Sequence, residues 1–320
     1  MPFLEAKNLT VNYTSRFSKV TALDSVSVSL PSHGYTLGVV GESGSGKTTF
    51  GMCLLNAIEP PGKIVDGVVE YMGKNVITMT KSELMNYRWK EISMIYQSAM
   101  NSLNPVKNIS QPIAEVIRNH DSTVTRHEAN ATAIRLLTEV GIKSDRVKDF
   151  PHQFSGGMRQ RVVIALALAL SPKILIADEP TSALDVVVQR QILSLLKREI
   201  TKKGLSLIFI THEISLLSGL VENVIVMYAG EIVESGPLSE VLSEPMHPYA
   251  EMLLSTIPSF EKDRAVKQDI IVEGELDSQF PLMNACKYAN RCKYVFDRCK
   301  KEKPLLKEAK KGRSVACHKY

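Results

Sequence analysis

Long apolar segments are missing from this chain of 320 residues. Its longest uninterrupted apolar run, residues 162–170, has nine residues, whereas a helix that crosses a bilayer needs about 20. The N-terminal residues show no basic stretch followed by an apolar run, and internal repeats and low-complexity tracts are lacking too. These absences argue against membrane-spanning, secreted and repeat proteins, so we expect a soluble cytoplasmic protein.

Cysteine is nearly absent from residues 1–280, which contain only Cys53, expected to be a small buried residue. The other four cysteines lie in residues 281–320. These last 40 residues hold twelve basic and three acidic side chains, a net charge of +9, whereas residues 1–280 hold 27 basic and 31 acidic side chains, a net charge of −4. The overall charge of +5 describes neither part, and the tail is expected to have a separate role.

Short apolar segments indicate a core of strands and helices. Strands are expected at residues 3–11, 22–30, 35–40, 173–177, 205–210 and 224–228. Helices are expected at residues 49–58, 129–140 and 186–200. Residues 82–150 are polar and helix-rich, as in a helical insertion. The order of these segments predicts an α/β fold with a β-rich edge, a helical insertion and a small C-terminal extension.

Residues 41–48, GESGSGKT, match the phosphate-loop pattern G-x-x-x-x-G-K-[ST] between an expected strand and an expected helix. Glycines allow backbone N–H groups to turn toward phosphate oxygens at a helix N-terminus. Lys47 would supply charge to the β- and γ-phosphates, and Thr48 a hydroxyl to Mg²⁺. Taken alone, the motif leaves open a glycine turn with an exposed lysine. The candidate nucleotide-binding residues here are Gly41, Glu42, Ser43, Gly44, Ser45, Gly46, Lys47, Thr48 and Thr49.

Two carboxylates end the apolar segment ILIADE at residues 174–179. Asp178 suits the Mg²⁺ shell of a phosphate-loop ATPase. Glu179, one residue later, could polarise the attacking water as a general base. The pair could also be an acidic, solvated strand end, but together with the phosphate loop it favours a nucleotide-hydrolysing site.

Five further segments carry a resemblance to a known family. Residues 155–160, SGGMRQ, resemble the signature motif of ABC ATPases. Gln97 resembles the Q-loop glutamine, and Asp185, in SALD, resembles the D-loop aspartate. His212 resembles the switch histidine, and Tyr13 the aromatic residue that stacks on adenine, although Tyr13 could equally belong to the core. The resemblance implies a P-loop NTPase of ABC type.

The family resemblance also assigns roles to these residues. It implies a head-to-tail dimer with two ATP molecules between the subunits, each held with Mg²⁺. Ser155, Gly156 and Gly157 would then bind the γ-phosphate of the ATP on the opposite subunit. His212 would contact the γ-phosphate or the attacking water. The implied catalytic residues are Glu179, His212 and Gln97, and the implied Mg²⁺ ligands are Thr48, Gln97 and Asp178.

Three segments indicate which branch of the ABC ATPase family the chain resembles. They are residues 97–105 (QSAMNSLNP), 247–250 (HPYA) and 253–258 (LLSTIP). They resemble the di-/oligopeptide import ATPases, a branch whose members can also serve importers of short oligosaccharides. The resemblance implies an ATPase subunit on the cytoplasmic face of the membrane that powers import through two separate permease subunits. About residues 82–150 would receive the permeases. A second similar ABC ATPase or another copy of this chain would complete the dimer. An extracellular solute-binding protein would act indirectly.

The tail cysteines follow the pattern Cys286-x5-Cys292-x6-Cys299-x17-Cys317. Members of this branch ligate a 4Fe–4S cluster with four such cysteines, and four thiolates suit that chemistry. The prolines that commonly flank the second cysteine are missing from residues 290–293. Zinc remains an alternative, with His318 as a substitute ligand, although C-x-x-C pairs are lacking.

These observations divide the chain into a nucleotide-binding domain at 1–243, with a helical subdomain at about 82–160, and a C-terminal extension at 244–320. The alternative function is a soluble ABC ATPase with an iron–sulfur cluster that acts on RNA or the ribosome. A single nucleotide domain and a tail without the aromatic interleaving of a single-strand binder argue against it. No nucleic acid partner is expected.

Overall fold

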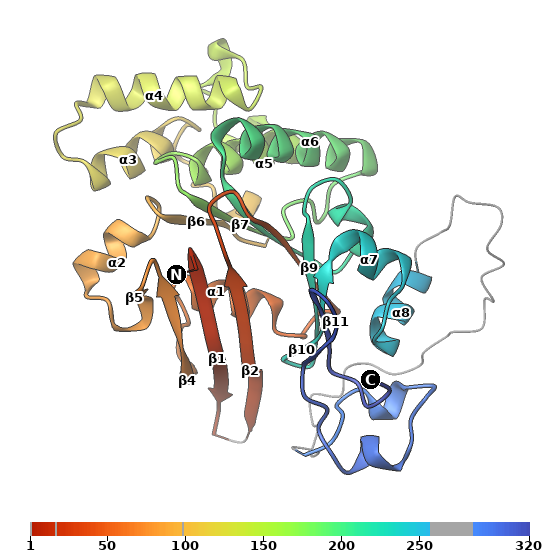
Figure 1. Ribbon diagram of the computed structural model, residues 1–320. Helices are drawn as coiled ribbons and strands as arrows, with labels where there is room; N and C mark the ends of the chain where they lie inside the picture. The colour runs from red at the N-terminus through yellow and green to blue at the C-terminus, as the bar shows by residue number, and fades with distance from the viewer. Residues whose placement is uncertain (1, 17, 98, 257–283) are drawn as a thin grey trace. The chain divides into compact units, whose positions relative to one another are not determined.

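The computed structural model describes residues 2–16, 18–97, 99–256 and 284–320 (Figure 1). The chain forms two compact units. Unit 1 comprises Met1–Pro31, Thr36–Ile77 and Ile210–Tyr320, and unit 2 comprises Ser32–Tyr35 and Thr78–Phe209. In the described ranges no helix is both long enough and apolar enough to cross a bilayer.

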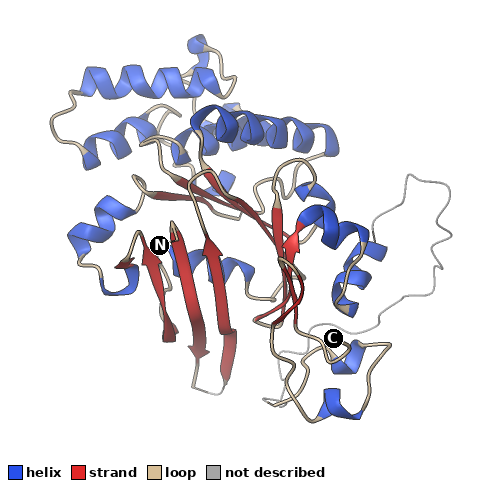
Figure 2. Ribbon diagram, viewed as in Figure 1, coloured by secondary structure: helices blue, strands red, loops and turns tan. Residues whose placement is uncertain are grey.

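Unit 1 contains an antiparallel sheet of four strands in the order β2-β1-β4-β5 (Figure 2). Its strands are β1 (Leu4–Thr14), β2 (Lys19–Leu30), β4 (Gly62–Tyr71) and β5 (Lys74–Asn75). In the second half of β2, Val26 and Leu30 are buried and Val28 is half-buried, whereas the serines at positions 25, 27 and 29 are exposed. This alternation with a period of two, which the sequence displays, is typical of a sheet with one face against the core.

A second set of strands in unit 1 positions the phosphate-loop segment. Its order is β11-β12-β10-β9-β3, with β3 parallel to β9 and the other neighbours antiparallel. The strands are β3 (Thr36–Val40), β9 (Asn223–Tyr228), β10 (Glu231–Pro237), β11 (Lys307–Lys310) and β12 (Arg313–Val315). The C-terminal tail thus adds two strands to a sheet formed by earlier residues. The helices of unit 1 are α1 (Lys47–Leu54), α7 (Leu238–Ser243) and α8 (Pro248–Ser255), with short 3-10 turns at Ile214–Leu217, Ala289–Arg291 and Asp297–Lys300.

Unit 2 combines a few parallel strands with most of the long helices (Figures 1 and 2). The strand β6 (Ile92–Ile95) pairs in parallel with β7 (Ile174–Asp178), and β8 (Ser206–Thr211) lies on the other side of β7 and leads into unit 1. Every residue of β6 and β7 is buried, as expected for parallel strands covered on both faces. The helices are α2 (Lys81–Tyr87), α3 (Gln111–His120), α4 (Arg126–Glu139), α5 (Gly156–Ala167) and α6 (Val186–Lys203).

All six predicted strands are present, and so are the three predicted helices, with shifted ends. The helix predicted to begin at residue 129 begins at Arg126, where Thr125 and Glu128 form a capping box. A capping box also starts α2, with Thr80 and Glu83, and this T-x-x-E spacing is a signal that could have located that helix. The sequence did not predict six strands of the structure: β4, β5, β6, β10, β11 and β12. Of these, β4 is half-exposed, and all the others except β10 have four residues or fewer.

The predicted domain boundaries remain predictions. Residues 82–160 contain α2 to α4, the start of α5 and also the strand β6. The tail after residue 243 contributes α8 and the strands β11 and β12. Residues 257 and 258, the end of the LLSTIP segment, lie outside the described residues.

A buried cluster of charged and polar groups joins the tail to the rest of unit 1. The Arg313 guanidinium donates to a Glu234 carboxylate oxygen at 2.7 Å, and both side chains are fully buried. Glu234 also accepts hydrogen bonds from the backbone N–H groups of Met246 and His247. His247 in turn caps α8, since its Nδ1 accepts from the Tyr249 N–H at 3.0 Å. Hydrogen bonds therefore compensate for the burial of most of these polar groups, although the Arg313 Nε is buried without a hydrogen-bond partner and lies 3.9 Å from a Glu240 carboxylate oxygen.

The burial of His247 makes unfolding depend on pH. Burial lowers the pKa of His247 to about 3, so the folded protein keeps the ring neutral while the unfolded chain takes up a proton below about pH 6.5. Stability from this group is complete above pH 6.5 and is lost as the pH falls toward 3. Between pH 7.5 and 5.0 we expect His247 to cost about 2 kcal/mol of unfolding free energy, measured by urea titration.

Two variants test this prediction: one removes the titrating ring of His247, and the control alters an exposed histidine. His247→Asn retains a side-chain cap for α8 and removes the titration, so its unfolding free energy should change less between the two pH values. His127→Asn, at an exposed position of α4, should behave as the unaltered protein does. An equal pH dependence in all three proteins would contradict the assignment.

Candidate functional site

The phosphate-loop segment connects β3 to α1, as the sequence predicts, and α1 begins at Lys47. Gly44 and Gly46 have positive φ angles of 79° and 99°, which favour glycine. A Cβ atom at Gly46 would also collide with the carbonyl oxygen of Ala22 on β2. The Lys47 side chain is buried and donates to the Glu42 carbonyl oxygen at 2.7 Å. The loop therefore has the compact backbone that anion binding by successive N–H groups requires.

Glu42, inside the phosphate loop, is held by two residues of the C-terminal extension. Its backbone N–H donates to the Tyr249 hydroxyl at 2.7 Å, and its carboxylate accepts from both terminal nitrogens of Arg291 at 2.8 and 2.9 Å. These hydrogen bonds raise the pKa of Arg291, and burial raises the pKa of Tyr249. Neither Tyr249 nor Arg291 was predicted to lie near the loop. No local signal links residues separated by 207 and 249 positions.

Two other predicted site residues lie in unit 1. Tyr13 is half-buried near the end of β1, opposite Gly62 of β4, where a Cβ atom would strike its ring. His212 follows β8 directly, its side chain is about half exposed, and its Nε2 lies 3.7 Å from a Glu213 carboxylate oxygen. Their proposed contacts with adenine and the γ-phosphate remain predictions.

In unit 2, strand register brings Gln97 and Glu179 together. The parallel pairing of Ile95 with Ala177 places each of them two residues beyond a paired position. The Gln97 Nε2 donates to a Glu179 carboxylate oxygen at 3.1 Å. Asp178 ends β7 and is buried, whereas Glu179 has a positive φ of 45°, uncommon for a residue with a side chain. The two carboxylates therefore differ in environment, since Asp178 is fully buried and Glu179 is half-buried.

Ser155 and Asp185 each cap a helix in unit 2. The Ser155 hydroxyl accepts from the Met158 N–H at the start of α5, and Asp185 accepts from the N–H groups of Val187 and Val188 at the start of α6. A Cβ atom at Gly157 would collide with the Val188 side chain, so the two helix starts are in close contact. Capping explains both residue types locally, and their roles toward nucleotide remain predictions.

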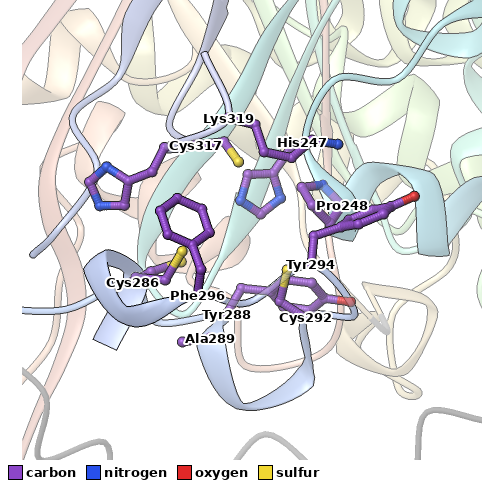
Figure 3. Close-up of a pocket in the computed structure, with 12 residues that line it drawn as sticks. His247, Pro248, Cys286, Tyr288, Ala289, Cys292, Tyr294, Phe296, Cys317 and Lys319 are labelled. Atoms are coloured by element: carbon purple, nitrogen blue, oxygen red, sulfur yellow. The ribbon is translucent and has the colours of Figure 1, made fainter. Parts of the chain in front are cut away.

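The four tail cysteines line one small pocket in unit 1, together with His247, Tyr288 and the other residues drawn in Figure 3. Burial raises the pKa of the Cys286 thiol to about 11 and also raises the pKa values of Cys292 and Cys317. Within the described residues, however, no group of three or more histidine, cysteine or acidic side chains is arranged to hold a metal ion. The predicted 4Fe–4S site is therefore not confirmed.

The structure also bears on Cys53, predicted to be a buried residue, and on His318, the alternative zinc ligand. Cys53 is fully buried in α1, as predicted, and burial raises the pKa of its thiol to about 12. His318 also lines the cysteine pocket, but its Nε2 hydrogen-bonds with the Glu302 carbonyl oxygen at 3.0 Å. This contact supplies the imidazole with a partner other than a metal.

Comparison with known proteins places the chain among transport ATPases. Residues 23–182 match the family described as ABC transporter, and residues 233–299 match the family described as oligopeptide/dipeptide transporter, C-terminal region. The oligopeptide transport ATP-binding protein AppD of Bacillus subtilis (strain 168) is 38% identical over 320 residues, which cover 99% of this chain and 96% of the relative. The dipeptide transport ATP-binding protein DppD of Escherichia coli (strain K12) is 38% identical over 322 residues, covering 99% and 97%.

Solved structures agree with these matches. The dimeric post-hydrolysis state of the ATP-binding cassette MJ0796, bound to ADP and Pi, is 27% identical with a TM-score of 0.65, covering 73% of this chain and 98% of that one. The cbiO1 protein of Clostridium perfringens, part of the transporter complex cbiONQ, is 25% identical with a TM-score of 0.64, covering 76% and 91%. The predicted fold class, an α/β P-loop NTPase of this type, is confirmed.

Proposed function

The chain belongs to the ABC transporter ATP-binding proteins of oligopeptide/dipeptide import type, and from this premise we propose that it powers peptide import by ATP hydrolysis. The observation that carries the proposal is the match of residues 233–299 to the C-terminal region of oligopeptide/dipeptide transporters. Relatives that extend over 99% of the chain are named for oligopeptide and dipeptide transport. The relatives described above are named for peptides and not for oligosaccharides, which favours peptides as the solute.

ATP binding is assigned to residues 41–49 and Tyr13. The backbone N–H groups of the phosphate loop and the Lys47 ammonium bind the phosphates, and Tyr13 stacks on the adenine. The Thr48 hydroxyl, the Asp178 carboxylate and the Gln97 amide are the groups that would hold Mg²⁺, and such oxygen donors suit this hard cation. Bound Mg²⁺ supplies charge neutralisation of the phosphates.

Glu179 is the proposed general base. Its carboxylate takes the proton of the water that attacks the γ-phosphate, and the hydrogen bond from Gln97 at 3.1 Å orients it. His212 holds the attacking water or the γ-phosphate. Most of the rate acceleration in such phosphoryl transfer comes from positioning and charge neutralisation.

The proposed active form is a head-to-tail dimer, with either a second copy or a similar ABC ATPase. Ser155, Gly156 and Gly157 of one subunit bind the γ-phosphate on the other, and Asp185 lies at the same contact. The N-terminus of α5 suits a phosphate because its dipole and N–H groups favour an anion. The similar ATP-binding cassette MJ0796, bound to ADP and Pi, is dimeric, which supports a dimer as the active form.

The remaining partners follow from the import function. The subunit acts at the cytoplasmic face of the membrane on two permease subunits, which about residues 82–150 receive. A solute-binding protein delivers the peptide. The nucleotide-binding domain is assigned to residues 1–243 and the C-terminal extension to residues 244–320.

No observation favours the alternative of an ATPase that acts on RNA or the ribosome. That hypothesis needs a basic tail with cations available for phosphates. Several tail cations instead pair with acidic residues elsewhere in unit 1: Lys287, Arg291, Lys293, Lys303, Lys310 and Arg313. Six of the twelve basic side chains of residues 281–320 therefore pair with acidic residues outside the tail.

We also propose that Cys286, Cys292, Cys299 and Cys317 hold a 4Fe–4S cluster. The support is the chemistry of the donor set, since four cysteine sulfurs line one pocket. As described, these thiols are not arranged around a metal, so loading would require them to lose protons and move closer together. The cluster would cross-link the tail.

Glu179→Gln should lower ATP turnover by a factor of about 10²–10⁴, because the amide cannot accept the proton of the attacking water. ATP binding and ATP-dependent dimer formation should persist, as measured by equilibrium binding and size-exclusion chromatography. The matched control is Glu115→Gln, which removes an exposed carboxylate that pairs with Lys107 in unit 2. Turnover at the control's rate in Glu179→Gln would overturn the base assignment.

Affinity purification of the tagged protein from membranes of its native cells tests the import function. Two multi-span membrane proteins should co-purify, since in the described residues no helix can cross a bilayer. Recovery of ribosomal RNA without membrane proteins would contradict the proposal.

Anaerobically purified protein should contain about four iron atoms per chain if the four thiols ligate the cluster. Iron and zinc are measured by elemental analysis. Cys292→Ser should lose the metal, whereas Cys53→Ala, a change at a cysteine outside the pocket, should retain it. One zinc per chain, or no metal at all, would contradict the iron–sulfur assignment.

A further inference from the structure

Glu42 introduces a negative charge into the loop that is assigned to bind phosphates. Its backbone is part of the phosphate loop, and its carbonyl oxygen accepts from Lys47. Two like charges at short range repel each other, more strongly where water is partly excluded. The Glu42 side chain is only 28% exposed, so solvent screens its charge incompletely. An uncompensated carboxylate here would weaken the binding of nucleotide phosphates.

Arg291 compensates this charge. Its two terminal nitrogens form a bidentate pair with the two Glu42 carboxylate oxygens, the strongest geometry for an arginine–carboxylate contact. The Arg291 side chain is 12% exposed, so the pair is better shielded from solvent than the exposed ion pairs of the tail.

An aromatic cluster fixes the position of Arg291. The rings of Tyr228, Tyr249 and Tyr288 pack edge to face with centroid distances of 4.7 to 5.5 Å. The Arg291 guanidinium lies 5.8 Å from the Tyr228 ring centroid and 5.9 Å from that of Tyr288. Because Tyr249 also accepts the Glu42 N–H, the same cluster contacts both the backbone and the carboxylate partner of Glu42.

The tail supports the loop at a second point. The Gly230 N–H donates to the Ser45 carbonyl oxygen at 3.0 Å, so the turn between β9 and β10 lies directly against the loop. Lys287 donates to the Ala229 carbonyl oxygen in this turn and forms an ion pair with Glu231 just after it. Lys287 and Arg291 are four residues apart, so one short tail segment contacts the loop directly through Arg291 and the adjacent turn through Lys287.

We propose that Arg291 is a positioning residue for the phosphate loop: it neutralises Glu42 and makes ATP affinity depend on the C-terminal extension. This inference rests on the proposed function, in which the loop binds the phosphates of ATP. Arg291 acts through Glu42 and touches no reacting atom itself. Removal of the Arg291 charge leaves Glu42 as an anion beside the phosphates.

The test compares the affinity for ATP with Mg²⁺ among variants, by isothermal titration calorimetry and steady-state kinetics. Arg291→Gln should raise the ATP Kd and KM by about three- to thirtyfold with kcat nearly unchanged. The loss should diminish at high salt, because salt screens the repulsion. Arg291→Lys keeps the charge and should recover most of the affinity.

Suppression by a second substitution separates charge compensation from a structural role. The double variant Arg291→Gln with Glu42→Gln removes both charges and should bind ATP more tightly than Arg291→Gln alone. A merely structural role for Arg291 predicts a lower melting temperature and no rescue of ATP affinity by Glu42→Gln. The proposal would be overturned by an unchanged ATP affinity in Arg291→Gln. It would also be overturned by a loss of affinity that the double variant retains.

The chain offers a matched control in the same tail. Arg298, like Arg291, directly precedes a cysteine, but its ion pair with Glu302 is exposed, with 60% and 57% of the two side chains accessible. Arg298→Gln should leave ATP affinity unchanged. If the unaltered protein binds no ATP, the proposed function fails; if it binds ATP and Arg291→Gln matches it, only this inference fails.

Discussion

The buried ion pair between Arg313 and Glu234 joins the tail to the sheet of unit 1, and the surroundings of the phosphate loop follow from that contact. Arg313 belongs to β12, which pairs with β10, so the pair holds the tail at the sheet edge. Glu234 also binds the backbone just before α8, which sets the start of the helix that carries Tyr249. Loss of one partner from a buried pair costs about 3–5 kcal/mol, a large share of the 5–15 kcal/mol that stabilises a typical domain.

The charge asymmetry of the chain has a physical explanation in this arrangement. The basic tail pairs with acidic residues of the remaining part of unit 1, including Asp24, Glu42 and Glu231. Opposite charges that are distant in sequence thus meet in the fold. A short tail with little core of its own gains attachment from these pairs and from its strands β11 and β12. The tail's positive charge therefore contributes to its attachment to the rest of unit 1.

The conformation of the phosphate loop and the placement of the carboxylates after β7 have different structural origins. In the loop, glycines permit backbone conformations that other residues resist, and the sheet and tail pack against the result. After β7, parallel register brings Gln97 within hydrogen-bond distance of Glu179. The glycines of the loop are visible as a sequence motif. The contact between Gln97 and Glu179 needs the pairing of strands separated by about 80 residues, although the order of the motifs made this contact a reasonable expectation.

The sequence by itself determined the strands with strong apolar patterns, the phosphate loop, the Asp178–Glu179 pair and the family. All of these are expressed by neighbouring residues, because backbone conformation and strand alternation are local properties. The half-exposed β4 and the short β6 lack such patterns. Only the tertiary structure decided that Arg291 and Tyr249 hold Glu42 and that Arg313 pairs with Glu234. Contacts between residues 79 to 249 positions apart arise from the packing of whole elements, which no local pattern encodes.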